Sequence, residues 1–153
     1  MWQRCNARAV KIYATKKYSP NLINTQTMEI KTNIHDELIT DMLITAFEGG
    51  SNYWATLDKV DRTHFVKGDS LAENVARSVL SDKNYKLYVY DVESDEDELE
   101  LLGTMTYASI EKAFNIMANE YPRRFSEIIS GDYDADDADV FFQLAVMGEI
   151  VFG

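Results

Sequence analysis

The hydrophobic positions of the chain first recur at helical spacing after Asn33, a residue placed to cap a helix. These positions are Leu38, Ile39, Met42, Leu43 and Ala46. The pair Gly49–Gly50 ends this predicted helix. A shorter helix is predicted from Leu71 to Leu80, where Ser70 and Glu73 have the spacing of a capping box.

A β-hairpin is predicted from two segments that are rich in aromatic and β-branched residues. The first segment is Tyr85–Val92 and the second is Leu99–Tyr107, and an acidic loop over residues 93–98 separates them. The earlier stretch Asn52–Val66 mixes aromatic and charged residues. It fits either short strands or an irregular loop.

The C-terminal third predicts further helices. One runs from Ile110 to Tyr121, and at Pro122 the chain either kinks or begins a new short helix that ends at Gly131. The last helix begins in the acidic residues 132–137, and its apolar residues cover almost every side, so we expect it at the centre of the core. The pattern predicts an α+β fold with four or five helices packed around a small antiparallel β-hairpin.

The charge divides the chain into two parts. The whole chain carries 15 basic and 26 acidic residues, a formal net charge of −11. Residues 1–27 contain five basic residues and no acid, so residues 28–153 carry a charge of −16. We interpret 28–153 as a single acidic globular domain that opens at Met28, and 1–27 as a basic N-terminal arm outside it. The arm is alternatively a contact to phosphates or a targeting peptide.

The composition excludes several classes of protein. A hydrophobic content of 46% over 153 residues is too high for a disordered chain. No apolar run is long enough to cross a bilayer, so no membrane association is predicted. The single cysteine, Cys5, forms neither an internal disulfide nor a thiolate metal site. We expect a small acidic domain of the cytoplasm that needs no cofactor.

The acidic loop is the first candidate site. Residues 91–100 contain seven acids, among them Asp95, Glu96, Asp97 and Glu98. Such a run suits a divalent cation or imitates a phosphate backbone. A solvated turn that keeps a strand edge from pairing with other chains explains the same residues and is the favoured interpretation of the run itself.

A second acidic group, Asp132, Asp134 and Asp136, alternates like the ligands of a calcium loop. The glycine and glutamate that such a loop needs later are replaced by Asp137 and Gln143. An acidic cap on a helix N-terminus explains the same residues and is the favoured interpretation. The three aspartates serve as metal ligands only in the alternative of a small divalent-metal-dependent hydrolase or nuclease.

Aromatic residues and histidines give the remaining candidates. Tyr53 and Trp54 are adjacent, and we expect them to form a binding surface if both are exposed. The two histidines, His35 and His64, belong to no catalytic motif, and Cys5 falls in the arm. No catalytic residue is predicted.

Three sequence stretches carry a resemblance to known proteins. Residues 138–153, ADVFFQLAVMGEIVFG, and residues 45–54, TAFEGGSNYW, resemble parts of short uncharacterised proteins encoded by phages and prophages. The strand end Tyr90–Glu93 resembles the same group. This resemblance covers residues 28–153 and implies a phage gene product that works in the bacterial cytoplasm, but it implies no activity and no catalytic residue.

Together these observations predict a non-enzymatic accessory protein of a phage or mobile element. It would bind a host or phage macromolecule through its acidic surface, and the expected partner is a protein with a basic surface, because negative charge speeds the encounter with positive charge. Nucleic acid is expected as a partner only through the basic arm.

Overall fold

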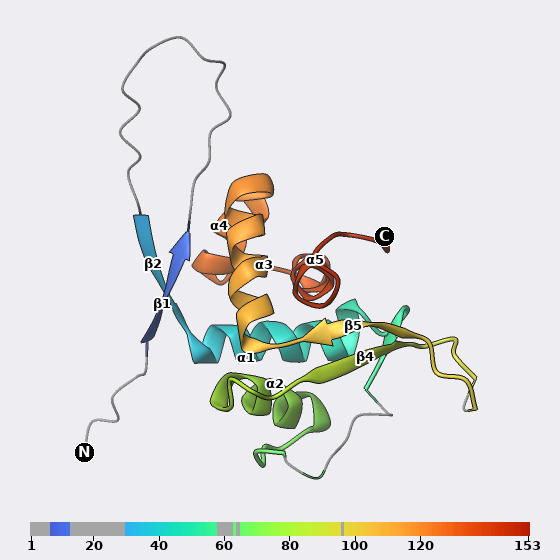
Figure 1. Cartoon of the computed structure of the whole chain (residues 1–153). Coiled ribbons are helices and arrows are strands. Elements are labelled where there is room, and N and C mark those ends of the chain that lie inside the picture. The colour runs from blue at the N-terminus through green and yellow to red at the C-terminus, as the bar shows by residue number, and fades with distance from the viewer. Residues whose placement is uncertain (1–6, 13–29, 58–62, 64, 96) are drawn as a thin grey trace.

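The computed structural model describes residues 7–12, 30–57, 63, 65–95 and 97–153. Within these ranges it confirms an α+β fold in which helices pack around an antiparallel hairpin (Figure 1). The elements in chain order are β1 (Ala7–Ile12), β2 (Ile30–His35), α1 (Asp36–Thr45), the π-helical turn η1 (Ala46–Gly50), β3 (Ala55–Thr56), α2 (Leu71–Ser81), β4 (Leu87–Asp91), β5 (Leu101–Met105), α3 (Tyr107–Glu120), α4 (Pro122–Ser130) and α5 (Ala135–Val146).

The predicted hairpin is formed by β4 and β5. Leu87 lies opposite Met105, and Tyr90 lies opposite Leu101, with a shift of register after Val89. β3 adds a short third strand to the other side of β4, so the strand order is β3-β4-β5. The undecided stretch Asn52–Val66 therefore contributes one two-residue strand, and its residues 58–62 and 64 lie outside the described residues.

A separate two-stranded sheet joins β1 to β2. The strands are antiparallel, with Ala7 opposite His35 and Ile12 opposite Ile30. β1 lies within the segment that we interpret as an arm, so six of those residues pair with a strand of the acidic part. The start of the domain at residue 28 stays a prediction, because residues 1–6 and 13–29 lie outside the described residues.

The helix ends agree with the sequence signals, with one exception. Asn33 does not cap α1, because the pairing with β1 holds it in the extended strand β2; His35 is the N-cap residue and makes no capping bond with its side chain. The hydroxyl of Ser70 accepts a hydrogen bond from the backbone nitrogen of Glu73, at 3.1 Å, as a cap should. Pro122 begins a new helix and does not kink the previous one.

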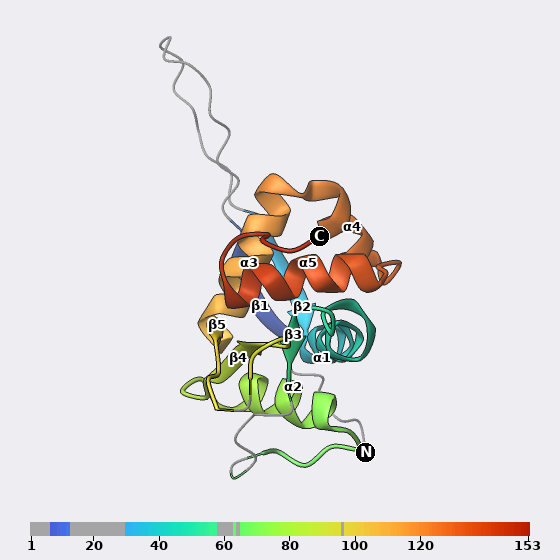
Figure 2. The same ribbon diagram turned by 90° about the vertical axis from the view of Figure 1, so that its right-hand side faces the viewer.

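α5 lies at the centre of the core, as its pattern predicts. Ten of its twelve residues are buried, and α1, η1, α3 and β5 all pack against it. Figure 2 shows this helix crossing the molecule between α4 and the sheet. Among the described residues, no helix combines the length and the apolar character that a membrane span needs.

Candidate functional site

The acidic loop between β4 and β5 is a folded turn with its own backbone bonds. The carboxylate of Asp91 accepts a hydrogen bond from the backbone nitrogen of Glu93, at 2.7 Å. The backbone nitrogen of Asp91 donates to the carbonyl of Glu100, at 3.0 Å, and closes the base of the loop. Figure 1 shows the loop reaching away from the helices. These hydrogen bonds therefore hold the described part of the loop on the outside of the protein.

The predicted binding residues of the loop face solvent where they are described. Asp95, Asp97 and Glu98 are exposed, whereas Glu96 lies outside the described residues. The ion pairs that join described residues to one another involve Glu73, Glu127 and Asp137, and none includes an acid of this loop. Its negative charge is therefore not neutralised by the described part of the chain.

The structure does not expose Tyr53 and Trp54 together. Tyr53 is 52% exposed, but Trp54 is only 2% exposed. The indole of Trp54 stacks on Phe152, with 5.1 Å between ring centroids, and packs against Phe142. Trp54 is thus a core residue and not part of a binding surface, because its ring and its polar atom both have partners inside the protein.

The partner of the indole nitrogen is Asp139, a buried carboxylate that the sequence pattern did not single out. Its Oδ1 accepts from the Ser51 hydroxyl at 2.6 Å and from Trp54 Nε1 at 2.7 Å. Its Oδ2 accepts from Gln143 Nε2 at 2.8 Å and from the Tyr53 hydroxyl at 3.1 Å. Four neutral donors therefore compensate one buried charge. The signal for this site was an acid beyond the acidic first turn of the helix that is expected at the centre of the core.

Tyr53 is affected by this carboxylate. Burial of its hydroxyl, followed by the charge of Asp139 and the hydrogen bond to it, raises the pKa of Tyr53 above 10.0. About half of Tyr53 is exposed to solvent, although its hydroxyl donates to Asp139. We interpret the group as a structural network, because each of its donors named above has Asp139 as its acceptor.

Gln143 extends the network to the C-terminal residues. Its Oε1 accepts from the backbone nitrogens of Val151 and Phe152, both at 2.8 Å. Its Nε2 also donates to the carbonyl of Phe152, at 2.9 Å. One buried side chain thus fixes the tail that follows α5 over Trp54.

The three aspartates of the metal hypothesis do not form a cluster. Asp134 is the N-cap of α5, and its carboxylate accepts from the backbone nitrogen of Asp137 at 3.0 Å. Asp132 and Asp136 are exposed. Across the described residues, no three His, Cys, Asp or Glu side chains lie where they could hold a metal ion. The capping role that the sequence favours is confirmed for Asp134.

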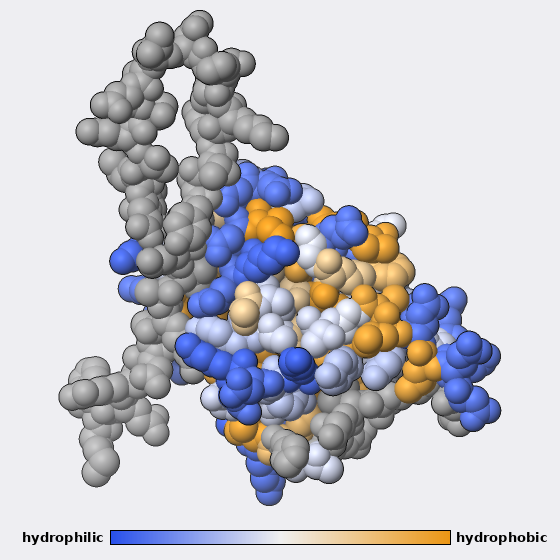
Figure 3. All heavy atoms as spheres, in the orientation of Figure 1, coloured by the Kyte–Doolittle hydropathy of each residue, from blue (hydrophilic) through white to orange (hydrophobic). Residues whose placement is uncertain are grey.

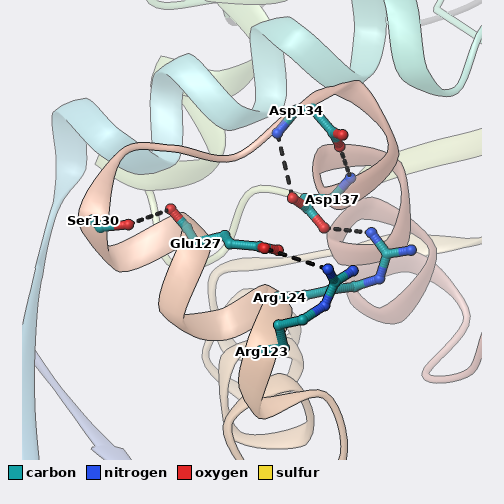
Figure 4. A network of polar contacts seen from close by, with 6 residues as sticks. All are labelled: Arg123, Arg124, Glu127, Ser130, Asp134 and Asp137. Carbon is teal, nitrogen blue, oxygen red and sulfur yellow. Dashed lines mark hydrogen bonds and ion pairs between the residues drawn. The ribbon is translucent and has the colours of Figure 1, made fainter.

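The same helix start is tied to α4 by an ion pair (Figure 4). Arg124 pairs with Asp137, whose side chain is 5% exposed, and Asp137 also completes the capping box with Asp134. Arg123, one residue earlier, points to Glu127 on its own helix, at 3.6 Å. Asp137 therefore holds two elements together, and its role is structural.

A second acidic surface lies in a groove of about 630 Å³ between α1 and α2. Its lining includes Asp36, Glu37, Asp41, Glu73 and Arg77. The backbone nitrogen of Asp69, and after it Arg77, lower the pKa of Glu73. Sequence reasoning missed this groove, because its acids come from two helices that only the fold brings together.

The remaining candidates are the two histidines and the single cysteine. His35 is exposed at the start of α1, whereas His64 and Cys5 lie outside the described residues. Compared with known proteins, the chain matches no family model, no curated protein and no solved structure. Any function must therefore be argued from the surfaces above.

Proposed function

We propose that this chain is a non-enzymatic binding protein of a phage or mobile element, and that it recognises a basic surface on another protein. The observation that carries the proposal is the hairpin loop, whose described acids are exposed and have no cationic partner among the described residues. The resemblance of residues 28–153 to phage-encoded proteins supports a phage or mobile element as the source of the chain. It also supports a partner from the phage or its bacterial host.

The physical basis is long-range attraction. Seven acids within ten residues, on a body with a charge of −16 over residues 28–153, create a negative potential around the loop. Such a potential raises the rate of encounter with a positive surface and repels nucleic acid. Because hydrogen bonds already fold the described residues of the loop, little chain entropy is lost there when a partner binds.

The alternative of a metal-dependent hydrolase has less support. Two-metal hydrolysis needs carboxylates that converge on shared ions. Asp134 is instead occupied as a helix cap, and Asp132 and Asp136 are exposed. We therefore favour binding over catalysis.

Affinity capture from a bacterial lysate tests the proposal, with bound proteins identified by mass spectrometry. The test variant removes three loop charges: Asp95→Asn, Asp97→Asn and Glu98→Gln. The matched control removes three exposed charges elsewhere: Glu48→Gln, Glu120→Gln and Asp132→Asn. We expect the wild type and the control to capture the same basic protein, and the loop variant to capture several-fold less.

The salt dependence of the captured complex gives the second readout. An electrostatic complex should dissociate as sodium chloride rises from about 0.05 M to about 0.5 M, because the screening length falls to a few ångströms. Equal capture by all three proteins, or a complex that survives high salt unchanged, would contradict the proposal.

A further inference from the structure

The groove between α1 and α2 combines an apolar lining with an acidic wall. Its volume is about 630 Å³, within the range of about 300–1,000 Å³ that is typical of sites for organic ligands. α1 lies beside α2 in both views (Figure 1, Figure 2), and the two helices pack on each other. Ile44 from α1, Leu80 from α2 and Val66 before α2 supply the apolar lining. The groove can therefore hold apolar as well as charged groups.

The acidic wall is one side of α1. Asp36, Glu37 and Asp41 line the groove from this helix, and their spacing places them on the same side of it. Glu37 and Asp41 are exposed, and the ion pairs between described residues include neither of them. Acids four residues apart on a helix repel each other. A positive charge placed between these two carboxylates would relieve that repulsion.

The charges on the opposite wall already compensate each other. Arg77 of α2 forms an ion pair with Glu73, one helical turn earlier. The carboxylate of Glu73 also accepts a hydrogen bond from the backbone nitrogen of Asp69, at 2.6 Å. The negative charge that a ligand can meet therefore comes from Glu37 and Asp41, and a basic ligand should place its own charges on the α1 side of the groove.

The two helices also limit the form of the ligand. α1 has ten residues and α2 has eleven, so each is about 15–17 Å long. Because the backbone groups of a helix bond to one another, the groove offers an extended peptide no strand edge to pair with. A helix satisfies its own backbone and can lay an apolar stripe in such a groove. A partner helix of about three turns matches the length of the two walls.

Charge decides which helix fits. A second copy of this chain would bring a net charge of −11 toward the acidic wall, so the wall opposes self-association. A helix with leucines on one side and lysines or arginines beside them would instead match the apolar lining and the acidic wall together. The same acids thus exclude one occupant and attract the other.

The groove and the hairpin loop are separate surfaces. The lining of the groove comes from residues 36–81, which precede the loop in the chain. The loop reaches away from the helices in Figure 1, and its hydrophilic surface lies at the right-hand margin of the molecule in Figure 3. The two acidic surfaces can therefore be tested independently of each other.

We propose that the groove between α1 and α2 is a docking site for a basic amphipathic helix of a partner protein. The apolar stripe of that helix covers Ile44, Val66 and Leu80. Its lysines or arginines lie along α1, against Glu37 and Asp41. Because this site is additional to the hairpin loop, the inference goes beyond the proposed function and does not depend on it.

The test uses the full chain and a fluorescein-labelled synthetic peptide of about twelve residues, in which leucines recur at helical spacing and lysines flank them. One control peptide has the same residues in an order that gives no apolar stripe, and another has glutamate in place of every lysine. We expect the striped peptide to bind, by fluorescence anisotropy, about tenfold more tightly than the scrambled one. It should also gain helical circular dichroism on binding, and the glutamate peptide should not bind.

Charge variants of the protein locate the acidic wall. Glu37→Gln combined with Asp41→Asn should weaken binding of the striped peptide several-fold. The matched control, Glu120→Gln combined with Asp132→Asn, removes the same number of charges at exposed positions elsewhere and should leave binding unchanged. The groove variant should unfold at no lower temperature than the wild type, because the two acids that it replaces repel each other. Its weaker binding would then not result from a loss of folded protein.

An apolar pair of variants locates the lining. Val66 is 41% exposed, so Val66→Ser changes the groove without opening the core, and it should weaken binding several-fold. Ile129→Ser is the matched control, since Ile129 is 38% exposed and lies on α4. This control should bind the striped peptide as the wild type does.

Three results would overturn the inference. Equal binding of the scrambled peptide would mean that charge alone attracts the peptide. A loss of peptide binding in the hairpin-loop variant, but not in the groove variant, would place the peptide at the loop and leave the proposed function standing. Concentration-dependent dimers in analytical ultracentrifugation, abolished by Val66→Ser, would assign the groove to a second copy. Lysate capture that the loop variant does not reduce would instead contradict the proposed function alone, because peptide binding in the groove is measured separately.

Discussion

A buried carboxylate must be compensated by hydrogen-bond donors, and Asp139 shows how this chain does it. Its four hydrogen bonds come from the loop after η1 and from Gln143 one turn later on α5. Gln143 then binds the tail. A single acid therefore links three segments, and its removal should be felt in all of them.

We expect Asp139→Asn to lower the free energy of unfolding by about 2 to 3 kcal/mol. An asparagine keeps the shape of the side chain but has only one acceptor oxygen. Its NH₂ group would face donors that now give hydrogen bonds to an oxygen of Asp139. Urea denaturation measures the change. Asp132→Asn, the same substitution at an exposed position, is the control and should change stability by less than about 0.5 kcal/mol. Equal effects at the two positions would contradict a structural role for the network.

The raised pKa of Tyr53 predicts a loss of stability in alkali. Below pH 10.0, the unfolded-state value, the contribution of this hydroxyl is fully present. It is lost as the pH rises through the higher pKa of the folded state, because the unfolded chain gives up the proton first. Unfolding free energies of the wild type and Tyr53→Phe, measured from about pH 8 to about pH 11, should therefore converge. Parallel curves would show that Tyr53 has no such linkage.

At the scale of elements, the joint between α4 and α5 depends on one arginine of an adjacent pair. Arg124 reaches Asp137 across the joint, and its side chain is 30% exposed, whereas Arg123 is 80% exposed and stays on its own helix (Figure 4). Desolvated, hydrogen-bonded pairs contribute more than exposed ones, and breaking them leaves a buried charge behind.

Arg124→Gln should therefore destabilise the protein by about 1 to 3 kcal/mol. Arg123→Gln, its neighbour on α4, should stay within about 0.5 kcal/mol of the wild type. Thermal or urea unfolding of the two variants under the same conditions compares their losses of unfolding free energy. If the Arg123 variant proved the weaker of the two, the ion pair to Asp137 would not be what holds the joint.

The elements that the sequence predicted correctly are those with local signals. Helical spacing, the Ser70 cap and Pro122 each determine the structure of residues close to them in the sequence. The hairpin is likewise formed by two β-rich segments that are neighbours in the sequence. The errors lie where distant residues decide. Asn33 is extended because β1 pairs with it. Trp54 is buried because it packs against Phe142 and Phe152, which are distant in the sequence, and Asp139, 85 positions away, accepts a hydrogen bond from its indole nitrogen.

The candidate site was predictable where its residues are neighbours in the sequence, and not where only the fold brings them together. The acidic loop is contiguous in sequence, so its charge is evident from the residues alone. The stacking of Phe152 on Trp54 was not predictable, since these residues are 98 positions apart in the sequence and only the fold brings them together. The groove between α1 and α2 escaped prediction for the same reason.

On the scale of the whole molecule, charge and fold divide the chain differently. The boundary in charge lies at residue 28, with +5 before it and −16 after it. The pairing of β1 with β2 crosses that boundary. Removing residues 1–27 would therefore remove basic charge and a strand together, and a change in nucleic-acid binding could not be assigned to either one.

The register of that small sheet offers a cleaner operation. Ile12 lies opposite Ile30, so the intervening 17 residues leave and rejoin the sheet at one point. They can be excised and replaced by a two-residue Asn-Gly turn, which suits antiparallel neighbours. The excision removes Lys16 and Lys17, while both strands keep their partners. The shortened chain would therefore measure what these two lysines contribute to binding with the β1–β2 sheet left in place.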